Sequence, residues 1–125
     1  MNPPHRVLII DDNAVNRRMA QVMFQKLGWH AETLDSGEGA LLHLVAHHYD
    51  LVLLDISMPG MNGLEVCQRI RADRALAGLR VIAYTAHALP EEQQRFLAGG
   101  FDDVLVKPIS SQAVQELLMA LLPCS

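Results

Sequence analysis

The chain has 125 residues, half of them hydrophobic, and a formal net charge of −4 at pH 7. This length suits one domain with its own hydrophobic core and leaves little room for a second domain. The mild acidity argues against direct nucleic-acid binding, which usually shows as a basic patch. No apolar run approaches the roughly 20 residues that span a bilayer, and the start, MNPPHRV, is not a secretory signal. We therefore expect one cytoplasmic domain over residues 1–125, without a membrane or nucleic-acid partner.

The two cysteines, Cys67 and Cys124, have no CxxC spacing that would indicate a metal or redox motif. We interpret both as ordinary thiols of a reducing compartment. Cys67 falls in a predicted helix and is expected to be packed there.

The first half of the chain alternates between apolar runs and helical periodicity. A strand is predicted at RVLII (6–10), and a helix follows at 13–28, with Gly28 as its C-cap. The apolar residues that give this helix its spacing are Val15, Met19, Val22, Met23 and Leu27. HAETL (30–34) is a second strand, less apolar and therefore nearer an edge. Ser36 is a candidate cap for a helix that runs through ALLHLVAHH (40–48).

The second half repeats the alternation. Strands are predicted at LVLL (51–54), VIAY (81–84) and VLV (104–106), and helices at 61–73, 89–100 and 110–122. The first of these helices offers Leu64, Val66, Cys67 and Ile70 to a core. Pro90 suits the first turn of the next helix. Ser110 is the expected N-cap of the last one, with a hydrophobic staple between Ile109 and Val114. Asp102 and Asp103 are assigned to a turn.

The element order is thus strand–helix, five times. Strands that are apolar throughout are usually buried on both faces, which indicates a parallel sheet between two layers of helices. Since crossovers are right-handed, few topologies remain. We predict an α/β fold with a doubly wound, five-stranded parallel sheet of order 2-1-3-4-5, the flavodoxin-like (βα)5 arrangement.

Polar residues stand where four of these strands end. Asp11 and Asp12 follow the first strand, Asp55 the third, Thr85 the fourth and Lys107 the fifth. In an open α/β sheet the carboxyl ends of the strands share one edge, and ligands bind where the winding reverses. The five side chains are therefore expected to converge.

Three carboxylates in one crevice repel one another, and a hard divalent cation such as Mg²⁺ suits an all-oxygen site. Lys107 adds a second positive charge and Thr85 a hydroxyl, which together would support a phosphoryl group. Asp55 is the best nucleophile because its strand is central, whereas Asp11 and Asp12 are better placed as metal ligands. A single aspartate after a strand is most often a helix cap or turn residue, so the prediction depends on the set.

Four motifs together resemble the receiver domain of bacterial two-component response regulators: LIIDDNAVNRR, DISMPGMNG, YTAHAL and GFDDVLVKPI. The resemblance covers about residues 5–122 and is strongest to receivers of hybrid histidine kinases. It implies a phosphoacceptor in two-component or phosphorelay signalling. Asp55 would take the phosphoryl group from a phosphohistidine of a histidine kinase or a histidine phosphotransfer protein. The domain would catalyse only its own phosphorylation and dephosphorylation.

The resemblance also implies the roles of individual residues. Asp12 and Asp55 would bind Mg²⁺ directly, Asp11 largely through water, and Ser57 through its backbone carbonyl. Thr85 and Lys107 would hold the phosphoryl oxygens.

The residues around this set have implied roles as well. The bond before Pro108 would be cis, and Pro59 and Gly63 would shape the loop after Asp55. Ser57 and His87 stand at positions that tune the phosphoryl lifetime.

One position departs from the family pattern. Many receivers carry an aromatic switch residue three positions before the lysine, and this chain has Val104 there. Signalling is then expected to use backbone and loop shifts. These would act on a downstream effector through the face formed by the helix at 89–100, the strand at 104–106 and the helix at 110–122.

Several alternatives remain open. A receiver-like module that never takes phosphate would not need the complete set, and a phosphohydrolase usually has a second acid where Ser57 stands. His43 and His47 have the spacing of a metal-ligand pair on one helix, without an evident third ligand. Met1 favours a stand-alone protein, whereas the hybrid-kinase resemblance favours a piece of a longer one.

Overall fold

The computed structural model describes residues 5–56, 63–76, 78–86, 89–107 and 109–121. The strands are β1 (Arg6–Ile10), β2 (His30–Leu34), β3 (Leu51–Asp55), β4 (Arg80–Thr85) and β5 (Asp103–Val106). The helices are α1 (Ala14–Lys26), α2 (Ala40–Ala46), α3 (Gly63–Ala72), α4 (Pro90–Ala98) and α5 (Ser111–Leu121), with a short 3-10 helix, η1, at Arg74–Leu76. The predicted alternation of strands and helices is confirmed, with shifts at element ends.

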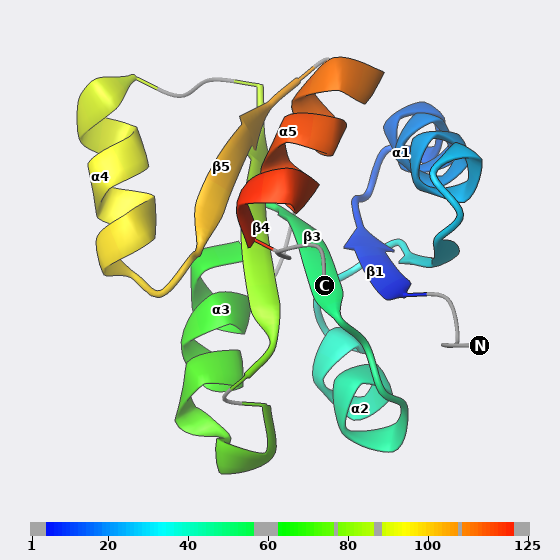
Figure 1. The fold of residues 1–125 in the computed structure, drawn as a ribbon. Helices are drawn as coiled ribbons and strands as arrows, with labels where there is room; N and C mark the ends of the chain where they lie inside the picture. The colour runs from blue at the N-terminus through cyan, green and yellow to red at the C-terminus, as the bar shows by residue number, and fades with distance from the viewer. Residues whose placement is uncertain (1–4, 57–62, 77, 87–88, 108, 122–125) are drawn as a thin grey trace.

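The strands form one parallel sheet in the order β2-β1-β3-β4-β5. The predicted topology and the edge position of β2 are thus confirmed. Helices α1 and α5 cover one face of the sheet, and α2, α3 and α4 cover the other (Figure 1). The winding reverses between β1 and β3, so the carboxyl ends of these two strands flank the expected ligand crevice.

Each face of the sheet supports its own hydrophobic layer. Leu8 and Val52 belong to the layer under α2, α3 and α4, whereas Ile9 and Leu53 belong to the layer under α1 and α5. Because successive strand side chains point to opposite faces, a strand buried on both sides is apolar throughout. Truncating a side chain such as Leu53 to alanine would cost about 2–5 kcal/mol.

Local signals explain where two helices begin. Asn13 caps α1 by accepting a hydrogen bond from the backbone N–H of Asn16 at 3.0 Å. Ser110 caps α5 by accepting one from the N–H of Ala113 at 3.1 Å, as predicted.

The ends of the predicted helices also agree with the structure. Gly28 follows the C-terminal end of α1 with φ +87°, the left-handed conformation that glycine adopts most readily. Ile109 and Val114 are both buried in the layer under α1 and α5, which agrees with the predicted staple.

Two local predictions were wrong. Helix α2 begins at Ala40 after Gly39, so Ser36 lies too far ahead to cap it. Asp103 is the first residue of β5 rather than part of a turn.

The neighbouring acid, Asp102, joins three segments. Its carboxylate accepts hydrogen bonds from the N–H of Val81 at 2.8 Å and from the guanidinium of Arg71 at 2.7 Å. Arg71 also donates to the carbonyl oxygens of Leu79 and Gly100. The acid therefore ties the end of α3 to the starts of β4 and β5, far from the crevice.

Cys67 is a packed thiol, as predicted. It is fully buried in α3 beside the backbone of Gly99, and burial raises the pKa of its thiol to about 11. The neutral thiol is a poor nucleophile at ordinary pH.

Helix α1 is confirmed, but its apolar residues do not all enter the core. Ala20 and Phe24 are buried, whereas Val15 is 68% and Met19 42% exposed. An apolar strip therefore remains on the solvent side of this helix. In the part of the chain that the structure describes, no helix is both long and apolar enough to span a bilayer.

Candidate functional site

The three predicted acids meet at the carboxyl end of the sheet. Asp11 and Asp12 follow β1, Asp55 ends β3, and these strands are neighbours. Each residue offers a carboxylate oxygen, and the three oxygens lie within 4.8 Å of one another. Asp11 is fully buried and Asp55 is 3% exposed, while Asp12 is open to solvent. The site therefore has a buried floor and one solvent-facing acid.

Hydrogen bonds to the backbone N–H, the backbone carbonyl and the carboxylate of Asp11 hold this residue in place. Its N–H donates to the carbonyl of Leu34 at 3.1 Å, and its own carbonyl accepts from the guanidinium of Arg17 at 2.9 Å. Its Oδ1 accepts from the N–H of Asn13 at 2.9 Å. These bonds fix the carboxylate with Oδ2 directed at the other charged groups of the site.

Lys107 places an ammonium between the two buried acids. Its backbone N–H donates to the carbonyl of Thr85 at 2.7 Å, which continues the β4–β5 pairing beyond the end of β5. Its Nζ lies 3.2 Å from Asp11 Oδ2 and 3.2 Å from Asp55 Oδ2, and its side chain is only 15% exposed. Because this ammonium is largely removed from water, its attraction to the two carboxylates is only weakly screened.

Thr85 and Tyr84 come to the site on β4. Tyr84 pairs with Asp55 in the β3–β4 register, and the buried Thr85 ends the strand one residue later. The ring of Tyr84 lies under Lys107, with its centroid 4.5 Å from Nζ. Burial, with the charges of Asp11 and Asp55, raises the pKa of the Tyr84 hydroxyl to about 12.

Tyr84 is a site residue that the sequence prediction missed. It lies directly before Thr85 in a run interpreted as plain core strand. Strand alternation was the available signal, since it turns Tyr84 toward the same face of the sheet as its partner Asp55.

Gly63, which the resemblance assigned to the loop after Asp55, is required by close packing. A Cβ at this position would lie 2.6 Å from the carbonyl oxygen of Asp55 and 2.9 Å from the Cα of Ile56. Its N–H donates to the carbonyl of Ile56 at 3.2 Å. The start of α3 therefore lies directly against the backbone that carries Asp55.

Some predicted residues lie outside the described part of the chain: Ser57, Pro59, His87, Pro108 and Cys124. Val104 is described, and its side chain is partly buried against the layer under α2, α3 and α4. The expected switch position therefore carries an aliphatic side chain that is partly buried at the margin of this layer.

The acids fit a hard divalent cation such as Mg²⁺. Their donors are all carboxylate oxygens, which Mg²⁺ prefers. Asp11 Oδ2 is buried and accepts no hydrogen bond from the described residues, so the ammonium of Lys107 is its contact there. A buried carboxylate oxygen that accepts no hydrogen bond is a suitable position for a cation or for a water molecule bound to one.

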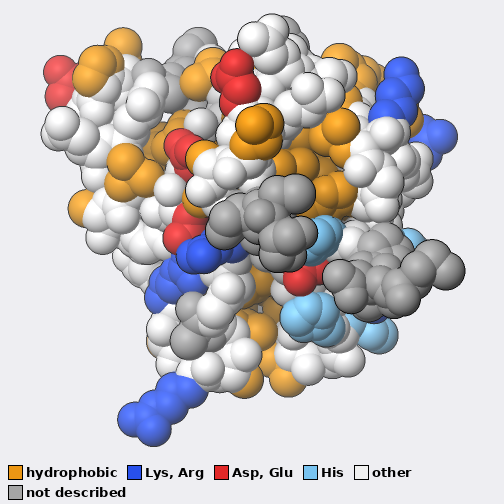
Figure 2. All heavy atoms as spheres, in the orientation of Figure 1, with side chains coloured by type: hydrophobic (Ala, Val, Ile, Leu, Met, Phe, Trp, Pro, Cys, Tyr) orange, Lys and Arg blue, Asp and Glu red, His pale blue; other side chains and the backbone are white. Residues whose placement is uncertain are grey.

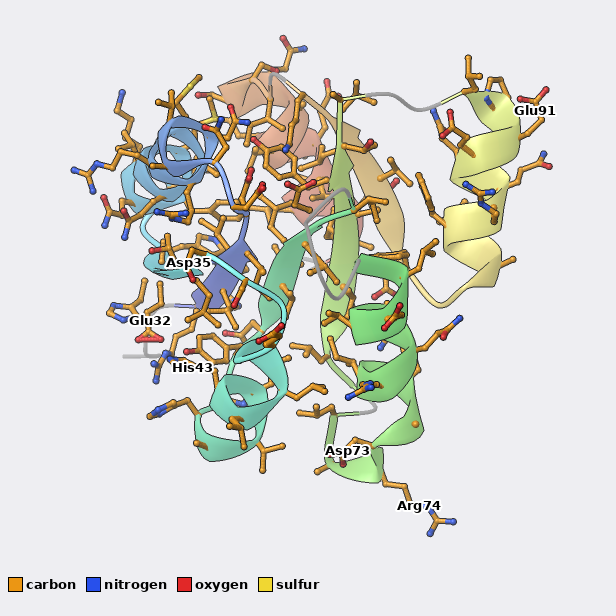
Figure 3. All side chains as sticks on the ribbon, turned by 180° about the vertical axis from the view of Figure 1, so that it is seen from behind. Glu32, Asp35, His43, Asp73, Arg74 and Glu91 are labelled. Atoms are coloured by element: carbon orange, nitrogen blue, oxygen red, sulfur yellow. The ribbon has the colours of Figure 1, made fainter. Side chains whose placement is uncertain are left out.

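The histidine alternative finds no support. His43 and His47 lie on and just after α2, where Figure 3 labels His43, with ring centroids 5.7 Å apart. Among the described residues, the one group of three or more potential ligand side chains is Asp11, Asp12 and Asp55. The histidine pair therefore has no third ligand in that part of the chain.

Fold and site together define a signalling receiver, and sequence comparison agrees. The sequence model of the response regulator receiver domain matches residues 7–119. The chain belongs to this family, the receiver domains of two-component signalling.

The curated relatives include sensor kinases from several bacteria. The chain is 35% identical over 117 residues to the sensor protein GacS of Pseudomonas syringae pv. syringae, covering 91% of the chain and 13% of that protein. It is 38% identical over 117 residues to the sensor histidine kinase RcsC of Escherichia coli strain K12, covering 94% of the chain and 12% of that protein. The chain thus spans only a small part of the relatives it matches.

Solved structures show the same fold. The chemotaxis protein CheY4 of Vibrio cholerae superposes with a TM-score of 0.89 at 28% identity, covering 96% of this chain and all of that one. The receiver domain of a sensor histidine kinase from Pseudomonas aeruginosa PAO1 gives 0.88 at 27% identity, covering 98% and 100%. That receiver has a magnesium ion coordinated in its active-site cleft.

Proposed function

We propose that Asp55 accepts a phosphoryl group from a phosphohistidine of a histidine kinase or phosphotransfer protein. The observation that carries this proposal is the pocket formed by Asp11, Asp12, Asp55 and the ammonium of Lys107. Asp55 ends the central strand of the sheet, and its carboxylate is backed by the fixed charge of Lys107. The magnesium-containing receiver of similar fold supports the same chemistry.

In the transfer step, an oxygen of the Asp55 carboxylate forms a bond to phosphorus while the bond from phosphorus to the imidazole nitrogen breaks. The electron pair of the broken bond stays on that nitrogen, and the imidazole of the donor is left neutral after proton exchange with solvent. Negative charge on the transferring oxygens is met by Lys107 Nζ, already 3.2 Å from Asp55 Oδ2, and by the Thr85 hydroxyl.

The proposed magnesium ligands are Asp12 and Asp55 directly, Asp11 largely through water, and the backbone carbonyl of Ser57. When bound there, Mg²⁺ would neutralise the crowded acids and the phosphoryl oxygens. The same residues would return the chain to its unphosphorylated state by hydrolysis, with Ser57 and His87 setting the lifetime of the acyl phosphate. Residues 1–125 then act as one receiver unit.

A phosphoryl donor needs a docking surface beside this pocket, and α1 offers one. A groove of about 540 Å³ lies along this helix and reaches Ser111 at the start of α5. Its lining includes Val15 and Met19, which are exposed, and it begins two residues after Asp12. Figure 2 shows apolar side chains on the surface between the regions of α1 and α5. We propose that the donor covers this groove while its histidine reaches Asp55.

The phosphorylated state is proposed to be sensed on the face formed by α4, β5 and α5. Leu97, Val106 and Met119 are exposed on these elements, and the first turn of α4 is acidic, with Glu91 at its solvent side (Figure 3). Thr85 lies at the end of β4 and Lys107 at the end of β5, so movement of either is passed directly to this face. Since Val104 is aliphatic, backbone shifts replace the rotation of an aromatic ring.

Acetyl phosphate with Mg²⁺ tests the phosphoacceptor assignment directly. Intact-mass measurement should show addition of one phosphoryl group to the wild-type chain, and none to Asp55→Asn. Asp35→Asn is the matched control, since Asp35 is an exposed acid after β2 at the same edge of the sheet. An unmodified wild type would support the module that never takes phosphate, and turnover of a generic phosphate ester would support a phosphohydrolase.

A further inference from the structure

We infer that Tyr84 is a positioning residue for phosphoryl transfer: its ring forms a platform that holds the ammonium of Lys107 over Asp55. The inference rests on the proposed phosphoacceptor function and adds a residue to it. Its basis is the 4.5 Å separation between Lys107 Nζ and the Tyr84 ring centroid, well within the range of a cation–π contact.

The backbone places the ring and the ammonium together. Tyr84 lies between the two strands that carry the reacting groups, because it pairs with Asp55 on β3 and with Leu105 on β5. The hydrogen bond from the Lys107 N–H to the Thr85 carbonyl then starts the lysine side chain beside the ring. The contact is therefore set by strand register rather than by a flexible loop.

Burial strengthens the contact between the Tyr84 ring and the ammonium of Lys107. Tyr84 is 2% exposed and the Lys107 side chain 15%, so little water competes for the ammonium. An aliphatic residue would fill the same space without the negative face of an aromatic ring. Desolvated cation–π contacts are stronger than those at exposed sites.

The ring offers an attraction that differs in kind from that of the two acids. Asp11 and Asp55 hold the ammonium through charge, and that charge is engaged when the acids bind a cation or when Asp55 becomes an acyl phosphate. Tyr84 is uncharged and keeps its attraction in every state of the site. It therefore keeps Lys107 near Asp55 when the ammonium has to turn to the phosphoryl oxygens.

Fluorinated phenylalanines at position 84 test the inference, because fluorine weakens the negative face of the ring while preserving its shape. Tyr84→Phe should phosphorylate with acetyl phosphate and Mg²⁺ at nearly the wild-type rate. Mono-, di- and trifluorinated analogues should then slow the reaction progressively, to about three- to ten-fold overall. A rate that does not change along the series would overturn the inference.

The matched control is the same series at Tyr49. This is the other tyrosine of the chain, also buried, and it lies under the guanidinium of Arg6 at 5.2 Å, at the opposite edge of the sheet. Fluorination there should leave the phosphorylation rate unchanged. Equal slowing by both series would mean that the ring acts through general packing, which also contradicts the inference.

A readout that needs no phosphorylation separates this inference from the proposed function. The ring current of Tyr84 should shift the ε-methylene proton resonances of Lys107 upfield, and Tyr84→Leu should abolish that shift whereas Tyr84→Phe retains it. If the wild type lacks this upfield shift, the Tyr84 ring does not hold the ammonium of Lys107, even if Asp55 is phosphorylated. If the wild type shows the shift but takes no phosphate, the phosphoacceptor function fails and the contact remains.

Discussion

At the residue scale, Lys107 is the cation that the two buried carboxylates share. Its ammonium lies at the same 3.2 Å from Asp11 Oδ2 and Asp55 Oδ2, so it would compete for both acids with the proposed Mg²⁺. Removing this charge should tighten Mg²⁺ binding, even though the proposed transfer step uses the same ammonium. The expected changes in Mg²⁺ affinity and in phosphorylation rate have opposite directions, so substitution of Lys107 distinguishes a loss of this charge from a general loss of structure.

We expect Lys107→Met to bind Mg²⁺ about ten-fold more tightly by calorimetric titration, and to phosphorylate more slowly than the wild type. Lys26→Met is the control, since Lys26 is the other lysine of the chain and lies exposed at the end of α1. Weaker Mg²⁺ binding by Lys107→Met would show that the ammonium does not compete with the metal.

Gly63 is the second residue whose substitution has a defined outcome. An alanine Cβ would meet two backbone atoms, the Asp55 oxygen at 2.6 Å and the Ile56 Cα at 2.9 Å, which cannot rotate away. Gly63→Ala should therefore destabilise the fold by about 1–3 kcal/mol in urea unfolding. It should also slow phosphorylation, because the Asp55 backbone has to shift.

The control for this substitution is Gly39→Ala. An added Cβ at Gly39 meets nothing within 4 Å, and its φ of −85° suits any residue. This variant should stay within about 0.5 kcal/mol of the wild type. A Gly63→Ala chain as stable and as reactive as this control would refute the packing argument.

At the element scale, α1 divides its apolar residues between the core and the solvent. The helix buries Ala20 and Phe24 and leaves Val15 and Met19 exposed. If the exposed strip receives the donor, a charge there should impair transfer from a protein donor and leave transfer from a small molecule intact.

Met19→Glu should therefore slow transfer from a phosphohistidine protein by about ten-fold, with little change in labelling by acetyl phosphate. Leu42→Glu is the matched control, because Leu42 is a strongly exposed apolar residue on α2, across the sheet. Equal slowing by the two variants, or equal slowing of both reactions by Met19→Glu, would remove α1 as the donor surface.

The elements themselves were largely predictable, for a physical reason. Strands such as LVLLD are buried on both faces, so composition alone identifies them, and their sequence order with right-handed crossovers leaves few topologies. Convergence of Asp11, Asp12, Asp55 and Lys107 then follows from the shared carboxyl edge of the sheet.

Other features depended on contacts that sequence spacing does not encode. Ser36 has the chemistry of a helix cap, but α2 starts four residues later. Asp102 resembles a turn residue, yet its carboxylate is used by Arg71 and Val81. Tyr84 resembles a core strand residue until the β4–β5 register brings Lys107 over its ring.

At the scale of the whole molecule, stability at alkaline pH depends on three buried groups: the two tyrosines and the thiol of Cys67. Burial is the main cause that raises the pKa of Tyr49 and of Tyr84 to about 12, from the ordinary value of 10. The unfolded chain therefore loses these protons first. The stabilisation from the tyrosines is complete below pH 10 and is lost as the pH rises from 10 toward 12. The contribution of the Cys67 thiol is lost earlier, as the pH rises from 9 toward 11.

Urea unfolding at a series of pH values checks this, with phenolate absorbance recorded on the folded protein. The wild type should lose stability through that window, and Tyr49→Phe should lose less of it. A free energy of unfolding that stays constant between pH 10 and 12, with phenolate forming normally in the folded protein, would contradict the burial argument.

Every role proposed for the site depends on phosphoryl transfer to Asp55 from a protein histidine. The most direct measurement incubates radiolabelled histidine kinase cores and phosphotransfer domains with the chain and follows the label on gels. We expect rapid, Mg²⁺-dependent movement of label to the wild type from at least one donor, and none to Asp55→Asn. Label that stays on every donor, or that reaches Asp55→Asn as readily as the wild type, would rule out Asp55 as the phosphoacceptor.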